Sequence, residues 1–349
     1  MASKGNKMEK EVLFDITHLQ KYFPIRKGFL KKHVGDVKAV DDVSVTVYKN
    51  ETLGIVGESG CGKTTFGKSI MLLDTPTGGE VLFHDRDGAK DITKMNAQEQ
   101  LHFRKRVQMV FQDPYNALNP LKKIIESFEG PLKLHGIKDK AEREEIMREV
   151  LRVVNTNPDY LYRYPHEFSG GQRQRLCIAR ALEVGPEVLV CDEPVSALDV
   201  SIQAQVLNLM KKIQRERKLT YLFIAHDLSV VQYMSDRIMV MYLGHVMEIA
   251  DSRALYDHPA HPYTEALLSA IPVPVRGAKK KRIILEGDVA SPINKPPGCV
   301  FHTRCRKCME RCKQEVPVMR EIAPGHRVAC HLYDGAETVT EPKGEEQTE

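Results

Sequence analysis

The chain has 349 residues, of which 51 are Lys or Arg and 47 are Asp or Glu, so its formal net charge is +4. A charged fraction of 28% with 42% hydrophobic residues is typical of a globular protein, and so small a net charge argues against a nucleic-acid binder. No run of 18 apolar residues occurs, and the first residues lack the apolar stretch of a secretory signal, which disfavours membrane-spanning and secreted proteins.

Short apolar runs alternate with helical patterns over the first 250 residues, which predicts an α/β fold with a mostly parallel sheet. Three runs are continuously apolar, as strands covered on both faces require: 53–56, 188–191 and 221–225. Glycine or polar residues follow each run. Because ligands bind beyond the carboxyl ends of parallel strands, we expect these residues to share one crevice.

Composition also divides the chain into parts. Residues 1–10 are expected to form a flexible N-terminus, and the polar residues 334–349 a disordered tail. The stretch 113–185 reads as a helical insert, because 140–154 carries apolar residues at helical spacing. The segment 272–298 is linker-like, since it is rich in proline and lysine.

A phosphate-binding loop follows the first apolar run. It fits G-x-x-x-x-G-K-[ST] and consists of Gly57, Glu58, Ser59, Gly60, Cys61, Gly62, Lys63, Thr64 and Thr65. Its glycines let successive N–H groups point at phosphate oxygens, and the helix predicted over 64–71 adds its positive end. Lys63 is expected to reach the β- and γ-phosphates and Thr64 to ligate Mg²⁺. A glycine-rich turn without a ligand is the alternative, which the strand before and the helix after disfavour.

An acidic pair follows the second apolar run. Asp192 is placed to hold Mg²⁺, and Glu193 is a candidate base for the attacking water. Together with the loop, the pair indicates a P-loop NTPase, which could be a transporter subunit, a helicase or a kinase.

A third motif consists of Ser169, Gly170, Gly171 and Gln172. Ser169 and Gln172 have capping-box spacing, and an apolar helical pattern follows and ends at Gly185. We therefore predict a helix whose N-terminal N–H groups an anion can approach closely.

With this motif the chain resembles the ATP-binding-cassette ATPases, whose hallmark is S-G-G-Q shortly before the Asp-Glu strand. Other motifs of that family follow in order: Gln112 resembles the Q-loop glutamine, Asp199 lies in a D-loop, and His226 resembles the switch histidine. Tyr22, with Phe23 as the alternate, resembles the aromatic residue that stacks on adenine.

The resemblance implies a role for each of these residues. Glu193, His226 and Gln112 would be catalytic, and Mg²⁺ would be held through Thr64, Gln112 and Asp192. Two subunits would dock head to tail, so that the signature residues 169–172 of one contact the ATP bound by the other.

A finer resemblance is to the oligopeptide/dipeptide permease ATPases, and specifically to the second, "F-type", of their two ATPase subunits. It rests on residues 22–26, 164–168, 193–201 and 261–263 and on the cysteine-bearing tail. It implies an ABC-type RecA-like core with antiparallel β and α-helical subdomains over 11–271 (helical subdomain about 113–185), then a linker and a Cys-rich lobe over 272–333.

The same resemblance implies partners and a location. The direct partners are a second ATPase subunit (a heterodimer is expected, a homodimer is the alternative) and two membrane permeases. An extracytoplasmic peptide-binding protein is an indirect partner, and nucleic acid is not expected to bind. The chain would lie at the cytoplasmic face of the membrane and contact the permeases through a groove near Gln112 and residues 115–120.

Five of the eight cysteines lie within the last 51 positions: Cys299, Cys305, Cys308, Cys312 and Cys330. Four thiolates can hold a [4Fe–4S] cluster or a structural Zn²⁺, and unligated thiols are the remaining alternative. The permease-ATPase resemblance implies an iron–sulfur cluster on Cys299, Cys305, Cys312 and Cys330, with Cys308 as the extra thiol.

Other functions stay open at this point. The chain could serve an importer of nickel or another small solute, or an exporter. It could be a cassette protein unrelated to transport, although such proteins usually carry two cassettes or a long coiled coil. The Cys-rich lobe could also be a redox sensor that regulates the ATPase.

Overall fold

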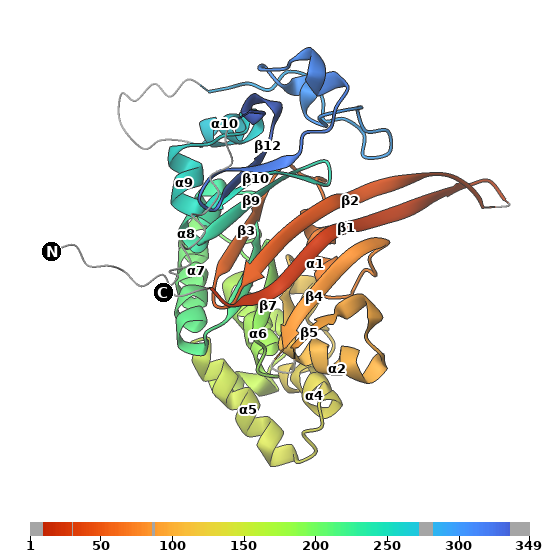
Figure 1. Ribbon diagram of the computed structural model, residues 1–349. Coiled ribbons are helices and arrows are strands. Elements are labelled where there is room, and N and C mark those ends of the chain that lie inside the picture. Colours follow the sequence, from red (N-terminus) through yellow and green to blue (C-terminus); the bar gives the residue numbers. More distant parts are fainter. Residues whose placement is uncertain (1–9, 30, 86–87, 272–281, 336–349) are drawn as a thin grey trace, which may run out of the picture.

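The computed structural model describes residues 10–29, 31–85, 88–271 and 282–335 (Figure 1). Most of the flexible N-terminus expected over 1–10, part of the linker expected over 272–298 and most of the tail expected over 334–349 lie outside these ranges, at residues 1–9, 272–281 and 336–349. Among the helices that the structure describes, none has the length and apolar character needed to cross a bilayer.

The N-terminal part forms an antiparallel sheet with the strand order β2-β1-β4-β5. Its strands are β1 (Val12–Lys27), β2 (Lys32–Tyr48), β4 (Gly78–Asp85) and β5 (Gly88–Asp91). The long β1–β2 hairpin projects beyond the body of the molecule (Figure 1). This sheet covers one face of the central sheet through the buried side chains of Phe14, Val45 and Phe83.

The central sheet has eight strands in the order β11-β12-β10-β9-β3-β8-β7-β6. In chain order they are β3 (Thr52–Val56), β6 (Val107–Val110), β7 (Val188–Asp192), β8 (Thr220–Ile224), β9 (Arg237–Tyr242), β10 (His245–Asp251), β11 (Met319–Ala323) and β12 (His326–Ala329). The strands β9, β3, β8, β7 and β6 are parallel, and β10, β12 and β11 continue the sheet in antiparallel fashion. The three predicted apolar strands are confirmed as β3, β7 and β8.

Both faces of these strands are covered, which explains their continuous apolar sequence. Val188 and Val190 pack into the cluster that contains β1 and Phe66 of helix α1 (Lys63–Ile70). Leu189 and Cys191 point the other way, into the cluster formed with the helices of the opposite face.

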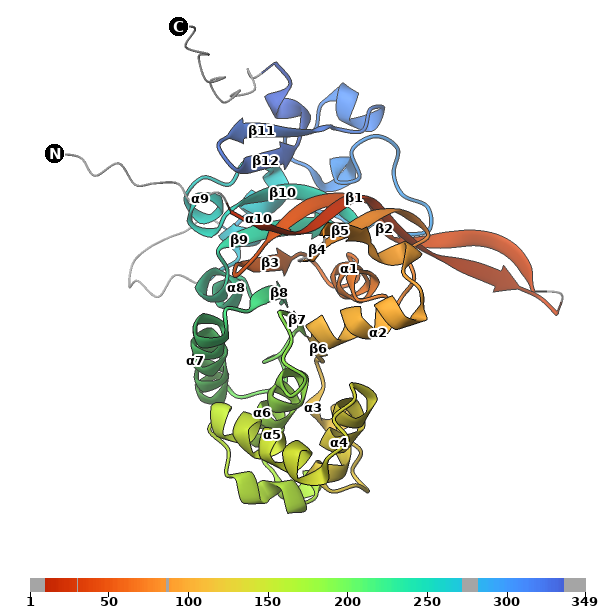
Figure 2. The same ribbon diagram turned by 60° about the horizontal axis from the view of Figure 1, so that its bottom comes forward.

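Helices make up most of the remainder. Helix α2 (Ala97–Arg106) precedes β6, and the stretch from Asp113 to Gly185 contains α3 (Pro114–Ala117), α4 (Ile124–Leu134), α5 (Lys140–Val153) and α6 (Gly170–Leu182). These four lie together at the end of the molecule away from β1 and β2 (Figure 2). The others are α7 (Val200–Arg217), α8 (Leu228–Met234), α9 (Ser252–Asp257) and α10 (Pro262–Ser269).

The Cys-bearing segment is joined to the central sheet by strand pairing and by a buried carboxylate. Val328 of β12 pairs with Glu248 of β10. The fully buried Glu248 carboxylate accepts hydrogen bonds from His326 Nε2 (2.7 Å) and from the backbone N–H groups of Ala260 (2.8 Å) and His261 (2.9 Å). This carboxylate therefore fixes the lobe against the ATPase core.

Candidate nucleotide-binding site

The predicted phosphate loop connects β3 to α1. Gly62 has φ +103°, and a Cβ there would lie 2.1 Å from the carbonyl oxygen of Ala39, so only glycine fits. The buried Lys63 ammonium donates to the carbonyl oxygens of Gly57 (2.8 Å) and Glu58 (3.1 Å). The loop thus encloses its own lysine at the carboxyl end of a parallel strand, where the sequence predicted the crevice.

Two side-chain oxygens that could ligate a metal ion, those of Thr64 and Asp192, lie together at the start of α1. The Thr64 hydroxyl donates to Asp192 Oδ1 at 2.9 Å, from an element 128 positions away. Burial raises the pKa of the Asp192 carboxyl and the adjacent Glu193 adds to the rise, while the Thr64 hydrogen bond opposes it. A hydroxyl and a carboxylate are hard oxygen ligands of the kind that Mg²⁺ prefers, so this pair fits the predicted magnesium site.

Two of the three predicted catalytic side chains, Gln112 and His226, contact the carboxylate of the third, Glu193. Gln112 Nε2 donates to Glu193 Oε2 (2.8 Å), and His226 Nδ1 lies 3.3 Å from the same oxygen. Glu193 has φ +45°, a left-handed backbone conformation that is uncommon outside glycine and that is found at functional sites. These residues follow β6, β7 and β8, which places them at one edge of the sheet.

The predicted signature helix is confirmed as α6. Ser169 Oγ accepts the N–H of Gln172 (3.4 Å), and Gln172 Oε1 accepts the N–H of Ser169 (3.0 Å), which completes the capping box. A Cβ on Gly171 would lie 2.4 Å from a methyl group of Ile202, so α7 packs directly against this turn. Asp199 precedes α7 and is exposed.

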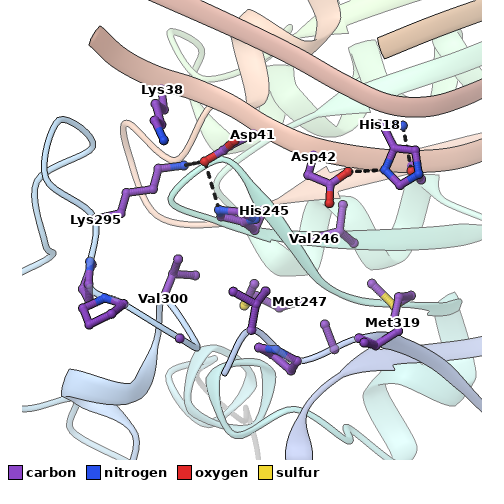
Figure 3. Close-up of a pocket in the computed structure, with 18 of the residues that line it drawn as sticks. His18, Lys38, Asp41, Asp42, His245, Val246, Met247, Lys295, Val300 and Met319 are labelled. Carbon is purple, nitrogen blue, oxygen red and sulfur yellow. Dashed lines mark hydrogen bonds and ion pairs between the residues drawn. The ribbon is translucent and has the colours of Figure 1, made fainter. Parts of the chain in front are cut away.

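Tyr22 lies at the base of the β1–β2 hairpin and is half-buried. Its hydroxyl donates to Asp41 Oδ1, and Lys38 Nζ lies 5.5 Å from the ring centroid. Asp41 also pairs with Lys295 Nζ (3.0 Å) and His245 Nε2 (3.4 Å), beside a cavity of about 780 Å³ between β2, β10 and the C-terminal segment (Figure 3). Although burial alone would raise the pKa of Asp41, the hydrogen bonds from His245, Tyr22 and Lys295 hold it well below its ordinary value.

Comparison with known proteins decides the family. Residues 40–196 match the family described as ABC transporter, and residues 247–312 match the oligopeptide/dipeptide transporter C-terminal region. The chain is 53% identical over 327 residues to the oligopeptide transport ATP-binding protein AppF of Bacillus subtilis (strain 168), covering 93% of this chain and 98% of the relative. This chain belongs to the ABC-transporter ATPases.

Two further comparisons agree with this assignment. A putative oligopeptide transport ATP-binding protein of Bacillus subtilis, YkfD, is 49% identical, covering 95% of this chain and 98% of the relative. The solved dimer of an ATP-binding cassette with bound ADP and Pi superposes with a TM-score of 0.59 at 28% identity, covering 69% of this ATPase and 99% of that chain.

The ABC ATPase also has a hollow on its helical part. Its volume is about 740 Å³, and residues 115–122 line it together with side chains of α4 and with Arg180 of α6. Arg180 donates to the carbonyl of Ala117 (2.7 Å), and Leu121 is 86% exposed at the rim. The hollow coincides with the predicted groove at residues 115–120.

The five C-terminal thiols of the ATPase lie near one another. Burial raises the pKa of Cys299 to about 12, and the nearby thiols of Cys305, Cys312 and Cys330 add to the rise. The N–H of Cys299 donates to the carbonyl of Cys312 (2.8 Å). Across the ranges that the structure describes, however, no three His, Cys, Asp or Glu side chains surround a position for a metal ion.

Four residues at the ATP site were missed by the sequence analysis. The Tyr263 hydroxyl accepts the N–H of Glu58 (2.9 Å), and the Arg304 guanidinium donates to both oxygens of the Glu58 carboxylate. Asp41 and Lys295 hold Tyr22, as described above. None of the four lies in a nucleotide-binding motif. Two had some signal in the sequence: Tyr263 belongs to residues 261–263, which carried the permease-ATPase resemblance, and Arg304 lies beside Cys305.

Proposed function

We propose that this chain is the ATP-hydrolysing subunit that energises oligopeptide import through partner membrane permeases. The convergence of Gln112 and His226 on Glu193, beside the phosphate loop, carries the proposal. The relatives named above, described as oligopeptide transport ATP-binding proteins, and the matching C-terminal region favour peptides over nickel or another small solute.

In this proposal the loop residues 57–65 bind the triphosphate. The Lys63 ammonium is released from its carbonyl partners to the phosphates, and the N-terminus of α1 adds partial positive charge. Tyr22 stacks on adenine. Thr64 and Asp192, with Gln112, would hold Mg²⁺, which supplies positive charge against the phosphate oxygens when bound.

Hydrolysis follows from the Glu193 cluster. Glu193 accepts a proton from the attacking water, while His226 and Gln112 hold its carboxylate and contact the γ-phosphate. The exposed Ser169 and the N–H groups of α6 are offered to the nucleotide of a second ATPase subunit, in a heterodimer or a homodimer. ATP held between two surfaces favours the closed dimer, and its hydrolysis releases the dimer.

The hollow lined by residues 115–122 is the docking surface for the permeases in this proposal. It follows Gln112 directly in sequence, so a change at the γ-phosphate can reach it through one loop. Docking there would place the ATPase at the cytoplasmic face of the membrane, beneath permeases that receive peptide from an extracytoplasmic binding protein.

The C-terminal thiols would hold a [4Fe–4S] cluster through Cys299, Cys305, Cys312 and Cys330. Support comes from the donor set, because soft thiolates are the ligands of such clusters and these four interact electrostatically in the structure. Zinc is the alternative for the same donors. The group would stabilise the lobe.

The substitution Glu193→Gln tests the function. The variant should bind ATP yet hydrolyse it at least about 100-fold more slowly, because the amide cannot accept the proton, and it should accumulate a closed dimer. ATP binding, phosphate release and size-exclusion chromatography are measured with the partner ATPase and Mg²⁺. Glu216→Gln, an exposed residue of α7, is the matched control and should hydrolyse ATP normally. Near-normal hydrolysis by Glu193→Gln contradicts the role of Glu193.

A further inference from the structure

The C-terminal segment contacts the proposed nucleotide site at its phosphate end. Arg304 donates from one terminal nitrogen to Glu58 Oε2 (2.7 Å) and from the other to Glu58 Oε1 (3.3 Å), across 246 positions of sequence. The Arg304 side chain is only 8% exposed. A bidentate pair with this much burial fixes both partners in orientation.

Glu58 is held from three sides. Its carboxylate contacts Arg304, its N–H donates to Tyr263, and its carbonyl accepts the Lys63 ammonium at 3.1 Å. The backbone of the phosphate loop and the position of Lys63 therefore depend on a residue of the Cys-bearing lobe. The Arg304 charge also offsets an acidic side chain that would otherwise repel a triphosphate.

The same segment also contacts the end of the proposed site where Tyr22 would stack on the adenine base. The Lys295 side chain is only 9% exposed, and its ammonium lies 3.0 Å from Asp41 Oδ2 (Figure 3). The other oxygen of Asp41 accepts a hydrogen bond from the Tyr22 hydroxyl. His245 Nε2 lies 3.4 Å from Asp41 Oδ2, the oxygen that Lys295 also contacts. Lys295 thus acts on Tyr22 through one carboxylate, and Arg304 acts on Lys63 through Glu58.

We propose that Arg304 and Lys295 are positioning residues of the ATP site. Through them the C-terminal segment holds the phosphate loop and Tyr22, the tyrosine proposed to stack on adenine, in position. The inference rests on the proposed roles of residues 57–65 and Tyr22. Neither residue contacts the reacting atoms. The lobe is accordingly a working part of nucleotide binding in this chain.

Because the two contacts act on different parts of the nucleotide, two ligands separate them. Mg-ATP carries base and phosphates, whereas magnesium tripolyphosphate carries phosphates alone. Arg304→Met should weaken both ligands about tenfold or more, because Glu58 is left charged and free to move. Lys295→Met should weaken ATP several-fold and leave tripolyphosphate unchanged. Dissociation constants are measured by calorimetry on the full chain.

Controls separate positioning from general damage. In the double variant Arg304→Met/Glu58→Gln the affinity for both ligands should recover toward that of the wild type, since the unpaired charge is gone. Arg304→Lys keeps the positive charge but not the bidentate geometry, so its affinity for both ligands should lie between those of Arg304→Met and the wild type. Arg306 is an exposed neighbour that donates to the carbonyl of Ile284, and the variant Arg306→Met should bind both ligands as the wild type does.

Two results would overturn the proposal. If Arg304→Met binds tripolyphosphate as tightly as the wild type, or if the double variant binds no better than Arg304→Met, Arg304 does not position the loop. If Lys295→Met loses equal affinity for both ligands, it does not act through Tyr22. A wild-type chain that fails to bind ATP would refute the proposed function instead.

Discussion

The carboxylate of Glu248 offers a test of how the Cys-bearing lobe is held. It accepts three hydrogen bonds, from Ala260, His261 and His326, at 2.7–2.9 Å in a site without solvent access. Glu248→Gln keeps the volume but replaces one acceptor oxygen by an amide N–H₂ group. Whichever way the amide points, at least one buried donor faces another donor.

The expected loss follows from these contacts. One hydrogen bond to a charged group is lost, worth about 1.5–3 kcal/mol, and its buried donor is left unpaired, so the free energy of unfolding should fall by about 2–4 kcal/mol. For a chain of 349 residues, with an unfolding entropy of about 2.1 cal/mol/K per residue, that corresponds to a fall in Tm of roughly 3–5 °C. Circular dichroism on heating measures it, and limited proteolysis reports whether the lobe is released.

The direction of the Glu248 pKa shift determines how its contribution to stability depends on pH. Burial alone would raise the pKa of Glu248, but the hydrogen bonds from His326 and from the backbone N–H groups of Ala260 and His261 outweigh it and lower the pKa. A carboxyl with a lowered folded pKa stabilises the protein above its unfolded pKa of about 4.3, and this contribution is lost as pH falls through the folded value. The deficit of Glu248→Gln should therefore be constant from about pH 7 to pH 5 and narrow below about pH 4.

Glu310→Gln is the matched control, because Glu310 lies in the same lobe and pairs with Lys313 at the surface. Its Tm should equal that of the wild type. A Tm of Glu248→Gln within about 1 °C of the wild type at pH 7 would refute the anchoring role of Glu248.

Two further predictions concern the lobe and the docking hollow. Anaerobically purified protein should be brown and contain iron and sulfide; Cys312→Ala should lose the iron and Cys308→Ala should keep it, whereas colourless protein with bound zinc would contradict the cluster. Leu121→Arg should keep the ATPase activity of the isolated subunit but fail to co-purify with the permeases, while Leu134→Arg, equally a surface change but outside the hollow, should still co-purify; co-purification by both variants would exclude the hollow as the docking surface.

Local sequence determined the parts of the site that a short segment can specify. The loop pattern of residues 57–65 and the capping box of Ser169 and Gln172 are each written in residues a few positions apart. The buried strands β3, β7 and β8 were predictable for the same reason, since a continuous apolar run needs cover on both faces whatever covers it.

Distant pairings could not be predicted in this way. Lys295 and Asp41 are 254 positions apart, and no spacing rule relates them. Strand β12 has four residues, too few for a periodic pattern, so its pairing with β10 and the burial of Glu248 were not visible in the sequence. The linker-like composition of 272–298 gave no sign of this attachment, because composition reports solvent preference and carries no information on strand pairing.

The contacts of the lobe have a thermodynamic consequence for the ATPase cycle. The lobe touches the core through Glu248, the phosphate loop through Glu58 and the base end through Asp41, so its arrangement and that of the proposed nucleotide site are linked. Linkage is reciprocal: whatever factor a change in the lobe applies to ATP affinity, ATP binding applies to the lobe. Arg304 directly precedes Cys305 in the sequence and pairs with Glu58, so a displacement of the backbone at Cys305 would act on the phosphate loop through the Arg304–Glu58 pair.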